Sequence, residues 1–581
     1  MNPSAEFTAS TPASRTASRF LALALFLLTA MAWSQGKPAS GAAASTSTTL
    51  KTPPSAQKPA RQAPKKTAAP APRMFLLPSS SPLYAVKIMV MAGSVDDPAG
   101  KEGLANLVSQ ALIEGGFGDP KHPVTKEKLA EITRPWGSAA MPSVRVDKQT
   151  TTFSMLVPKD AFPQFVRSVL QPMFSRPLFQ QKEIDRLRTD ALNEIQSKLR
   201  FEEQELLGLQ ALESYVFQGT ALSAPAYGTV QGLKAVERAD IIKFYRTFYT
   251  AHDVAIATSA TPESAKLLRT ALPLGAKPPQ QLCNCDVQTP EGRQVLIITL
   301  SNAIATGIHL GFPLDVQRGT PDYWPLFIAN TYLGAHRDEF GRLFQEIREA
   351  RGYNYGDYSY IEYVANAPYD LFPPPDTPRS QQYFSLWVRP IGHQYAHFIM
   401  KAVTAELDRF AREGMTPQQV EETKIKARTL YLKYAENVDR QLGYRLDDAF
   451  YGMDNHGYLA EMLKNIDAVN ADTVNAVIHR YLQARNLRYV ITTNESDAGQ
   501  LADDIAGNTN CTPKSAAGYH LADPPTEAQR ELLDQDQEWI AYHLNIQRSD
   551  IYIVKAGQMF ETASLPGMPP VAAAPAAGAG K

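Results

Sequence analysis

The sequence has few cysteines, almost no net charge and only one sustained apolar run. Three cysteines stand among 581 residues: Cys283, Cys285 and Cys511. Because three is an odd number, at least one thiol stays unpaired whatever disulfide forms. Cys283 and Cys285 have no histidine nearby and are a weak zinc signal. We expect a structural tie at a domain joint, in which Cys511 could pair with either of the other two.

Charge of one sign is also missing. The formal net charge is −1, from 58 basic and 59 acidic residues. A surface that binds nucleic acid or an anionic membrane needs an excess of Lys and Arg, so we expect neither partner. With 44% apolar and 9% aromatic residues, the chain should bury a sizeable core, divided over about two to four domains.

The one long apolar run lies near the N-terminus. It covers the fourteen residues 20–33 and follows Arg15 and Arg19. A membrane span needs roughly 20 residues, and Ala30-Met-Ala32 suits cleavage of a signal peptide. We therefore expect residues 1–32 to be a signal peptide and the chain to be periplasmic (Gram-negative-type) or secreted, with no membrane span after signal removal. An uncleaved interfacial anchor is the alternative.

Composition separates three further segments from the folded part. Residues 33–73 are rich in Ala, Pro and Ser, and such a stretch buries too little apolar surface to offset its ordering entropy. We expect a disordered spacer there and a disordered tail at 561–581. Residues 511–560 predict a C-terminal extension with one helix and one strand whose place in the fold is open.

A long-range repeat divides the remainder into two halves. Asp240 and Asp472 each open a helical segment, as good N-cap residues do, and a tyrosine follows each aspartate after nine residues. A strand follows each helix, at 254–258 and 487–492. The mixture of strands and long helices predicts an α+β fold, with a mainly antiparallel sheet covered by helices in each half. The predicted domains are 74–275 and 294–510, joined by a linker at 276–293.

A helix predicted at Gly103–Gly115 follows the turn Asp96-Asp-Pro-Ala-Gly100. Apolar residues recur at the i, i+3, i+4 and i+7 spacing of an amphipathic helix. They are Leu104, Leu107, Val108, Ala111 and Leu112. The other face of this helix carries only neutral polar groups, from Asn106, Ser109 and Gln110.

This turn and helix resemble the pitrilysin/insulinase family of zinc metallopeptidases, whose Asp-Pro-x-Gly turn precedes a Gly-Leu-Ala-His-x-x-Glu-His helix. In that family the two histidines hold Zn²⁺, the glutamate is the general base and a later glutamate is the third ligand. Here Asn106 and Gln110 replace the histidines, and Ser109 replaces the base. Amides are poor zinc ligands, and a serine hydroxyl accepts no proton at neutral pH. We expect no metal and no cofactor in this chain.

Only the third-ligand position is retained. Glu194 matches the family's Arg-x-x-Val-x-x-Glu pattern, with Ala191 in place of valine. One carboxylate alone does not hold a catalytic zinc, so we expect a structural role for Glu194. His393 and His397 have the i, i+4 spacing of zinc ligands without an acidic residue between them, and a surface pair is favoured over a metal site.

The second half contains a segment, residues 331–355, that resembles the family's Leu-Phe-x-x-Leu-Arg-Glu-x-x-Gly-x-x-Tyr pattern. Its apolar residues predict a helix, Gly352 suits the αL position that ends one, and a strand should begin with Tyr353 and Tyr355 on one side. The predicted helix face consists of Phe340, Leu343, Phe344 and Ile347.

The resemblance implies a role for Arg348 and Tyr355. In the family, an Arg and a Tyr seven positions later reach the active site opposite the zinc. Both are strong hydrogen-bond donors, which could orient the substrate and stabilise the oxyanion of the tetrahedral intermediate. The alternative is that Arg348 offsets the helix dipole and that Tyr355 packs in the sheet.

The family includes bacterial heterodimers in which one chain carries the zinc motif and the other carries the Arg/Tyr pair. The resemblance covers residues 74–510 and implies the second type: a chain inactive alone that forms half of a clam-like chamber. Zinc would be held by a paralogous partner with a His-x-x-Glu-His motif, and the substrate would be a peptide or unfolded protein. A pseudopeptidase for binding or assembly, and an independent enzyme using other ligands, are the alternatives. The proline-rich insertion 363–378 is a partner or substrate loop, or an inert excursion.

Overall fold

The computed structural model of the chain describes residues 72–272, 274, 287–514 and 518–569. All of these fall within one unit, Ala68–Lys581. The predicted signal peptide, nearly all of the predicted spacer, and Cys283 and Cys285 lie outside the described residues.

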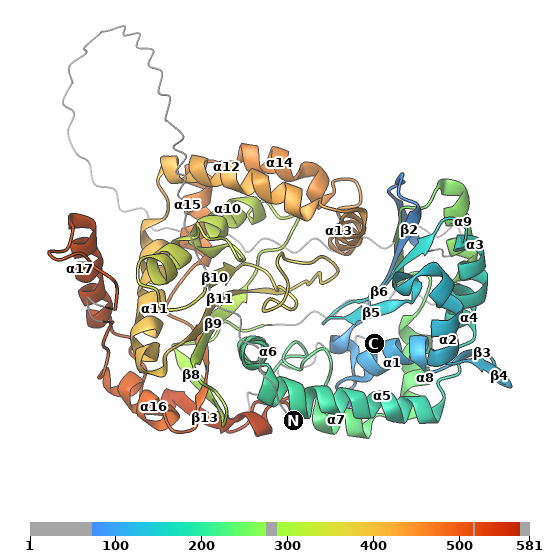
Figure 1. The fold of residues 1–581 in the computed structure, drawn as a ribbon, viewed down its shortest axis with the longest axis horizontal. Helices are drawn as coiled ribbons and strands as arrows, with labels where there is room; N and C mark the ends of the chain where they lie inside the picture. Colours follow the sequence, from blue (N-terminus) through green and yellow to red (C-terminus); the bar gives the residue numbers. More distant parts are fainter. Residues whose placement is uncertain (1–71, 273, 275–286, 515–517, 570–581) are drawn as a thin grey trace, which may run out of the picture. The chain divides into compact units, whose positions relative to one another are not determined.

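Five strands of the first half form a sheet in the order β1-β7-β2-β6-β5 (Figure 1). β1 runs parallel to β7, and the remaining neighbours are antiparallel. The strands are β1 (Arg73–Leu76), β2 (Leu83–Val90), β5 (Ser143–Val146), β6 (Thr151–Pro158) and β7 (Val254–Thr258). A separate hairpin joins β3 (Phe117–Asp119) and β4 (His122–Val124).

The second half forms a six-stranded sheet in the order β10-β11-β9-β12-β8-β13. β8 pairs in parallel with both β12 and β13, and the other pairs are antiparallel. The strands are β8 (Gln294–Leu300), β9 (Thr306–Leu314), β10 (Asp357–Tyr360), β11 (Gln382–Ile391), β12 (Arg488–Asn494) and β13 (Ile551–Lys555).

The two sheets repeat one topology, which confirms the two homologous halves. Without β13, the second sheet reads β8-β12-β9-β11-β10, the same pattern of parallel and antiparallel neighbours as β1-β7-β2-β6-β5. The counterpart of β8 is therefore β1, and β2 corresponds to β9. β1 begins at Arg73, one residue inside the predicted spacer, and that boundary was wrong.

The helices of the repeat lie where the sequence predicts them, but their N-cap residues are not the predicted ones. In the first half, the Glu237 N–H donates to the Asp240 carboxylate at 2.9 Å, so Asp240 lies in the first turn. In the second half, Asn470 is the N-cap and accepts the Thr473 N–H at 3.0 Å. The prediction that aspartate is the N-cap was wrong in both halves, although each aspartate still faces the positive end of the helix dipole.

Helices cover both sheets (Figure 1). Those of the first half are α1 (Leu104–Glu114), α2 (Lys126–Thr133), α3 (Phe162–Phe165), α4 (Gln171–Ser175), α5 (Gln181–Asn193), α6 (Gln204–Val216), α7 (Val230–Ala235), α8 (Arg238–Phe248) and α9 (Pro262–Ala271). Those that follow are α10 (Tyr323–Gly334), α11 (Ala396–Glu413), α12 (Pro417–Tyr434), α13 (Val438–Tyr451), α14 (Tyr458–Ala468), α15 (Ala471–Tyr481), α16 (Ala498–Gly507) and α17 (Glu527–Ala541). Three π-helical stretches interrupt this pattern, at Val166–Leu170, Glu194–Glu202 and Phe344–Glu349.

One helix of each half packs against the sheet of the other half. α6 packs against β9 and β12 of the second sheet, where Gly208 makes room for the buried ring of His309. α13 packs against β2 and β7 of the first sheet, and its Leu442 and Leu446 share an apolar cluster with Met89. This exchange buries apolar surface from both halves in common cores.

The C-terminal extension also reaches both halves. β13 adds an edge strand to the second sheet, and the chain then returns to the first half. There the Val230 N–H donates to the Phe560 carbonyl at 3.0 Å, and Arg200 donates to the Met559 carbonyl. Leu565 is 5% exposed, and the partly buried Met568 packs against the same core. The prediction of a disordered tail beginning at 561 was therefore wrong for the part of the chain up to Met568, which these two side chains hold against the first half.

Candidate functional site

The helix predicted at Gly103–Gly115 is α1, Leu104–Glu114, flanked by those two glycines. Its start is fixed by Asp97, whose carboxylate accepts the N–H groups of Gly103 and Ala105 at 2.7 Å each. Gly103 has a φ of +107°, and a Cβ there would meet a Leu233 methyl at 2.6 Å. The turn and the apolar stripe of this helix are confirmed.

The polar face of α1 carries no group suited to zinc. Ser109 is fully buried, and its hydroxyl donates to the Asn106 carbonyl at 2.8 Å. The Asn106 amide donates to the Tyr227 carbonyl at 3.5 Å, and Gln110 is half-buried. Zinc in proteins takes imidazole, thiolate or carboxylate ligands, so two amides and a hydroxyl do not fit the ion.

Among the described residues, no group of three or more His, Cys, Asp or Glu side chains could hold a metal ion. Glu194 begins the π-helical stretch after α5, with its side chain 54% exposed and 2.8 Å from Lys198 Nζ. Ile195 and Leu187 are buried beside it. Glu194 thus makes a surface ion pair, of a kind worth little to stability.

The two histidines at i, i+4 do not form a surface pair. His397 is 3% exposed, and its Nδ1 lies 2.8 Å from the Thr509 carbonyl. His393 Nδ1 lies 2.8 Å from the Thr306 hydroxyl, and its Nε2 lies 2.9 Å from Asn494 Nδ2. The prediction of a surface pair was wrong, because each ring has its own polar partners and the two do not converge on one point.

The segment that carries Arg348 and Tyr355 has the predicted order of a helix, a glycine and a strand. The helix is a π-helical stretch, Phe344–Glu349, and Gly352 ends it with a φ of +64° and an N–H that donates to the Arg348 carbonyl at 2.8 Å. Such stretches are frequent at functional sites. A π-helical turn cannot be told from an α-helical one in the sequence, because one extra residue in a turn leaves the apolar spacing almost unchanged.

Two details of the predicted segment were wrong. Phe340 is 76% exposed and lies under Lys426 Nζ, at 4.4 Å from the ring centroid, so it is no part of the buried helix face. The strand β10 begins only at Asp357, and Tyr353 and Tyr355 do not share a side. Tyr353 is 7% exposed, whereas Tyr355 is 77% exposed.

Arg348 and Tyr355 are both accessible to another molecule. The Arg348 side chain is 37% exposed, and its Nη1 lies 3.4 Å from the carboxylate of the adjacent Glu349. The Tyr355 hydroxyl makes no hydrogen bond to any described residue. The alternative that Tyr355 packs in the sheet is thus wrong. No hydrogen bond or ion pair joins either side chain to α1 within the described ranges.

The proline-rich insertion 363–378 is tied down at its base. Asp376 lies 2.6 Å from Lys87 Nζ in a buried ion pair with the first half. Tyr363 lies under the guanidinium of Arg379, 3.5 Å from its ring centroid. Tyr369 and Leu371 near the tip are 60% and 63% exposed. The insertion therefore holds the two halves together at its base and presents an apolar tip to solvent.

Sequence reasoning missed the residues that support the Arg348–Tyr355 segment. Arg351 is buried against α17, and Asp357 is buried at the start of β10 with an Asn354 amide donating to it at 2.8 Å. Burial raises the pKa of Asp357 to about 8. The one sequence feature that could have pointed to this contact is the spacing of Asp536 and Trp539, which places both residues on one face of α17. Cys511 forms no disulfide with any described residue, and the predicted ties to Cys283 and Cys285 lie outside the described residues.

Comparison with known proteins decides the family. Residues 76–230 match the model described as insulinase (peptidase family M16), and residues 235–426 match the model described as the peptidase M16 inactive domain. The chain belongs to the M16 peptidase family. The first match lies inside the first predicted half, whereas the second begins at residue 235 in that half and continues through the predicted linker into the second half. The segment with Arg348 and Tyr355 falls in the second match.

Two curated relatives are each less than 25% identical to this chain. An uncharacterized zinc protease of Streptomyces coelicolor is 24% identical over 302 residues, 50% of this chain and 61% of the relative. One of Mycobacterium bovis is 23% identical over 283 residues, 46% of this chain and 58% of the relative. This chain thus spans about three-fifths of the length of these curated relatives.

Solved structures of the M16 family share the fold. The crystal structure of a peptidase M16 inactive domain from Pseudomonas fluorescens aligns with a TM-score of 0.63 at 17% identity, over 74% of this chain and 97% of that chain. At this identity the likeness shows the fold alone. In the described part of the chain, no helix has the length and apolar character needed to cross a membrane.

Proposed function

We propose that this chain is the non-zinc subunit of an exported, heterodimeric M16 metallopeptidase, inactive alone, to which it contributes Arg348 and Tyr355. The observation that carries the proposal is the contrast between two surfaces. The α1 face offers only Asn106, Ser109 and Gln110, whereas Arg348 and the 77%-exposed Tyr355 keep the sequence context of the family's Arg/Tyr pair.

The chemistry of the pair suits substrate orientation. A guanidinium and a phenol hydroxyl both donate hydrogen bonds, so they can hold a scissile carbonyl and stabilise negative charge on its oxygen. In the proposed pair, zinc and its His-x-x-Glu-His ligands belong to a paralogous subunit that faces Arg348 and Tyr355. The substrate is a peptide or an unfolded segment, and the place of action is the periplasm or the exterior of the cell.

The test uses this chain co-expressed with a His-x-x-Glu-His family member from the same genome. Arg348→Ala and Tyr355→Phe should each lower turnover of a fluorogenic peptide by about a hundredfold, as the loss of an oxyanion donor does, with unchanged zinc content of the pair. Arg412→Ala is the matched control, with a side chain 64% exposed, and should keep full turnover. Full activity of both test variants would reject this role.

A binding or assembly subunit is the second candidate, favoured by the neutral α1 face. It predicts that the chain forms a stable complex whose peptidase activity is indifferent to Arg348 and Tyr355. The same variants thus separate the two functions, because the second candidate has no use for either hydrogen-bond donor.

A further inference from the structure

Arg351 lies between Arg348 and Tyr355 in the sequence and is held by the C-terminal extension. Its side chain is fully buried. Its Nε donates to the Asp536 carboxylate at 2.9 Å, and its Nη2 donates to the Gln535 side chain at 2.8 Å. The guanidinium also lies over the Trp539 ring, 4.0 Å from the centroid. Three residues of α17 therefore fix the position of one side chain in the Arg348–Tyr355 segment.

The same segment is held at a second point, two residues later. The Tyr353 hydroxyl lies 2.8 Å from the Tyr519 hydroxyl and accepts the Lys514 N–H at 2.8 Å. Lys514 Nζ donates to the Gly352 carbonyl at 2.5 Å. The chain before α17 therefore fixes the glycine that ends the π-helical stretch, as well as the residue after it.

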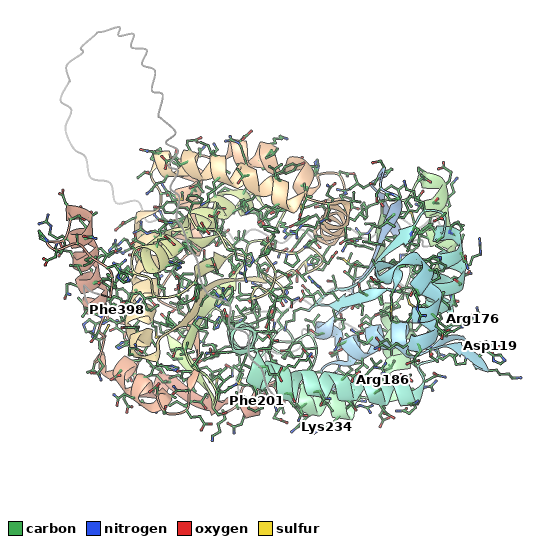
Figure 2. All side chains as sticks on the ribbon, viewed as in Figure 1. Asp119, Arg176, Arg186, Phe201, Lys234 and Phe398 are labelled. Carbon is green, nitrogen blue, oxygen red and sulfur yellow. The ribbon has the colours of Figure 1, made fainter. Side chains whose placement is uncertain are left out.

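Aromatic rings join the two points of attachment. Phe398 of α11, labelled in Figure 2, lies 5.9 Å from the Tyr353 ring and 5.8 Å from the Trp539 ring, between centroids. Trp539 is fully buried, and its indole N–H donates to Glu406 at 3.1 Å. Glu406 also accepts the Nε–H of Arg342, near the start of the π-helical stretch, at 2.8 Å.

Buried and exposed side chains are thus interleaved along the Arg348–Tyr355 segment. Arg351 and Tyr353 point inward to the extension, and Arg348 and Tyr355 stay exposed. A site works only when its groups are held close to their productive geometry by neighbours whose own positions are fixed. A segment with exposed functional groups and buried anchors between them meets that requirement.

We propose that the C-terminal extension is a brace for the Arg348–Tyr355 segment, and that Asp536, Trp539 and Tyr519 are positioning residues for it. The extension acts through Arg351 and Tyr353, which it contacts directly. The effect on peptidase activity rests on the proposed function, whereas the effect on the order of the segment does not.

The first measurement uses the isolated full chain. In Asp536→Asn, amide hydrogen exchange in peptides covering 348–356 should become about tenfold faster, because local opening needs less free energy. Tyr519→Phe removes one hydroxyl, should fold normally, and should give a smaller acceleration in the same peptides. Asp447→Asn is the matched control, since Asp447 is 1% exposed and pairs with the buried Arg318 at 2.9 Å. It should leave those peptides unchanged.

The second measurement uses the pair with the zinc-bearing partner. Asp536→Asn and Tyr519→Phe should lower kcat in proportion to the faster exchange and leave KM within about twofold, whereas Asp447→Asn should keep kcat. Unchanged exchange at 348–356 in both test variants would overturn the brace. Faster exchange with full kcat in these variants and in Arg348→Ala would support the brace and reject the proposed function instead.

Discussion

Arg379 gives the sharpest test of how the two halves are joined. Its side chain is 1% exposed and donates to Asp147 at 2.6 and 2.8 Å and to Glu213. Asp147 and Glu213 belong to the first half, and their side chains are 3% and 2% exposed. In Arg379→Met, Glu213 keeps Lys148 at 3.4 Å, but Asp147 loses both of its Arg379 contacts.

The expected cost follows from that burial. Removing one partner of a buried ion pair costs about 3–5 kcal/mol, because the other charge stays desolvated. That is a large share of the roughly 5–15 kcal/mol that stabilises a folded domain. Urea denaturation followed by circular dichroism should show the loss at pH 7.

A second arginine of the same half serves as the control. Arg389 donates to Glu205 at two distances of 3.1 Å, and Glu205 lies on α6, as Glu213 does. The side chains of Arg389 and Glu205 are 25% and 21% exposed, so Arg389→Met should cost about 1 kcal/mol or less. Equal losses of free energy in Arg379→Met and Arg389→Met would refute the argument from burial.

Three further predictions concern other parts of the chain. A Cβ on Gly208 would lie 2.1 Å from His309 Nε2, so Gly208→Ala should lower the free energy of unfolding by about 1–3 kcal/mol in urea denaturation. Gly499 has open space around it, so Gly499→Ala should raise the free energy of unfolding by about 0.5–1 kcal/mol. Equal effects of the two would contradict the packing. Burial raises the pKa of Asp357 from 3.8 to about 8, and a raised carboxyl pKa stabilises most at acid pH and loses that contribution as the pH rises toward 8. The melting temperature of Asp357→Asn should therefore equal that of the wild type near pH 4 and exceed it at pH 8. A difference in melting temperature that does not change with pH would be evidence against the buried carboxyl. After dialysis against zinc, mass spectrometry of the isolated chain should show no stoichiometric metal. One zinc ion per chain would contradict the claim that the polar face of α1 does not fit the ion.

Local sequence patterns were enough to predict the repeat and the elements that carry the candidate site. The apolar spacing from Leu104 to Leu112 fixes α1, and Gly352 ends its helix with the positive φ that only glycine adopts readily. The polar residues of α1 can be identified from the sequence alone, so the absence of zinc-binding side chains on this helix could be predicted without the structure. The order of the two sheets also follows from the repeat once one half is known.

Contacts between distant residues could not be predicted in this way. Arg351 and Asp536 are 185 positions apart, and nothing local marks Arg351 as buried while Arg348 is not. For the insertion 363–378 the sequence allows both a contact loop and an inert excursion, because the charges that bind its base lie in the other half. The pairing of β13 with β8 was missed for the same reason, since an added edge strand leaves no mark on the strand that it joins.

The reconstituted peptidase tests the central claim most directly. The chain alone, the His-x-x-Glu-His partner alone, and the two together are assayed on one fluorogenic peptide, with and without a zinc chelator. The account predicts activity only in the mixture, abolished by the chelator and reduced about a hundredfold by Arg348→Ala. Full activity of the partner alone, or a mixture whose turnover does not depend on Arg348 and Tyr355, would contradict it.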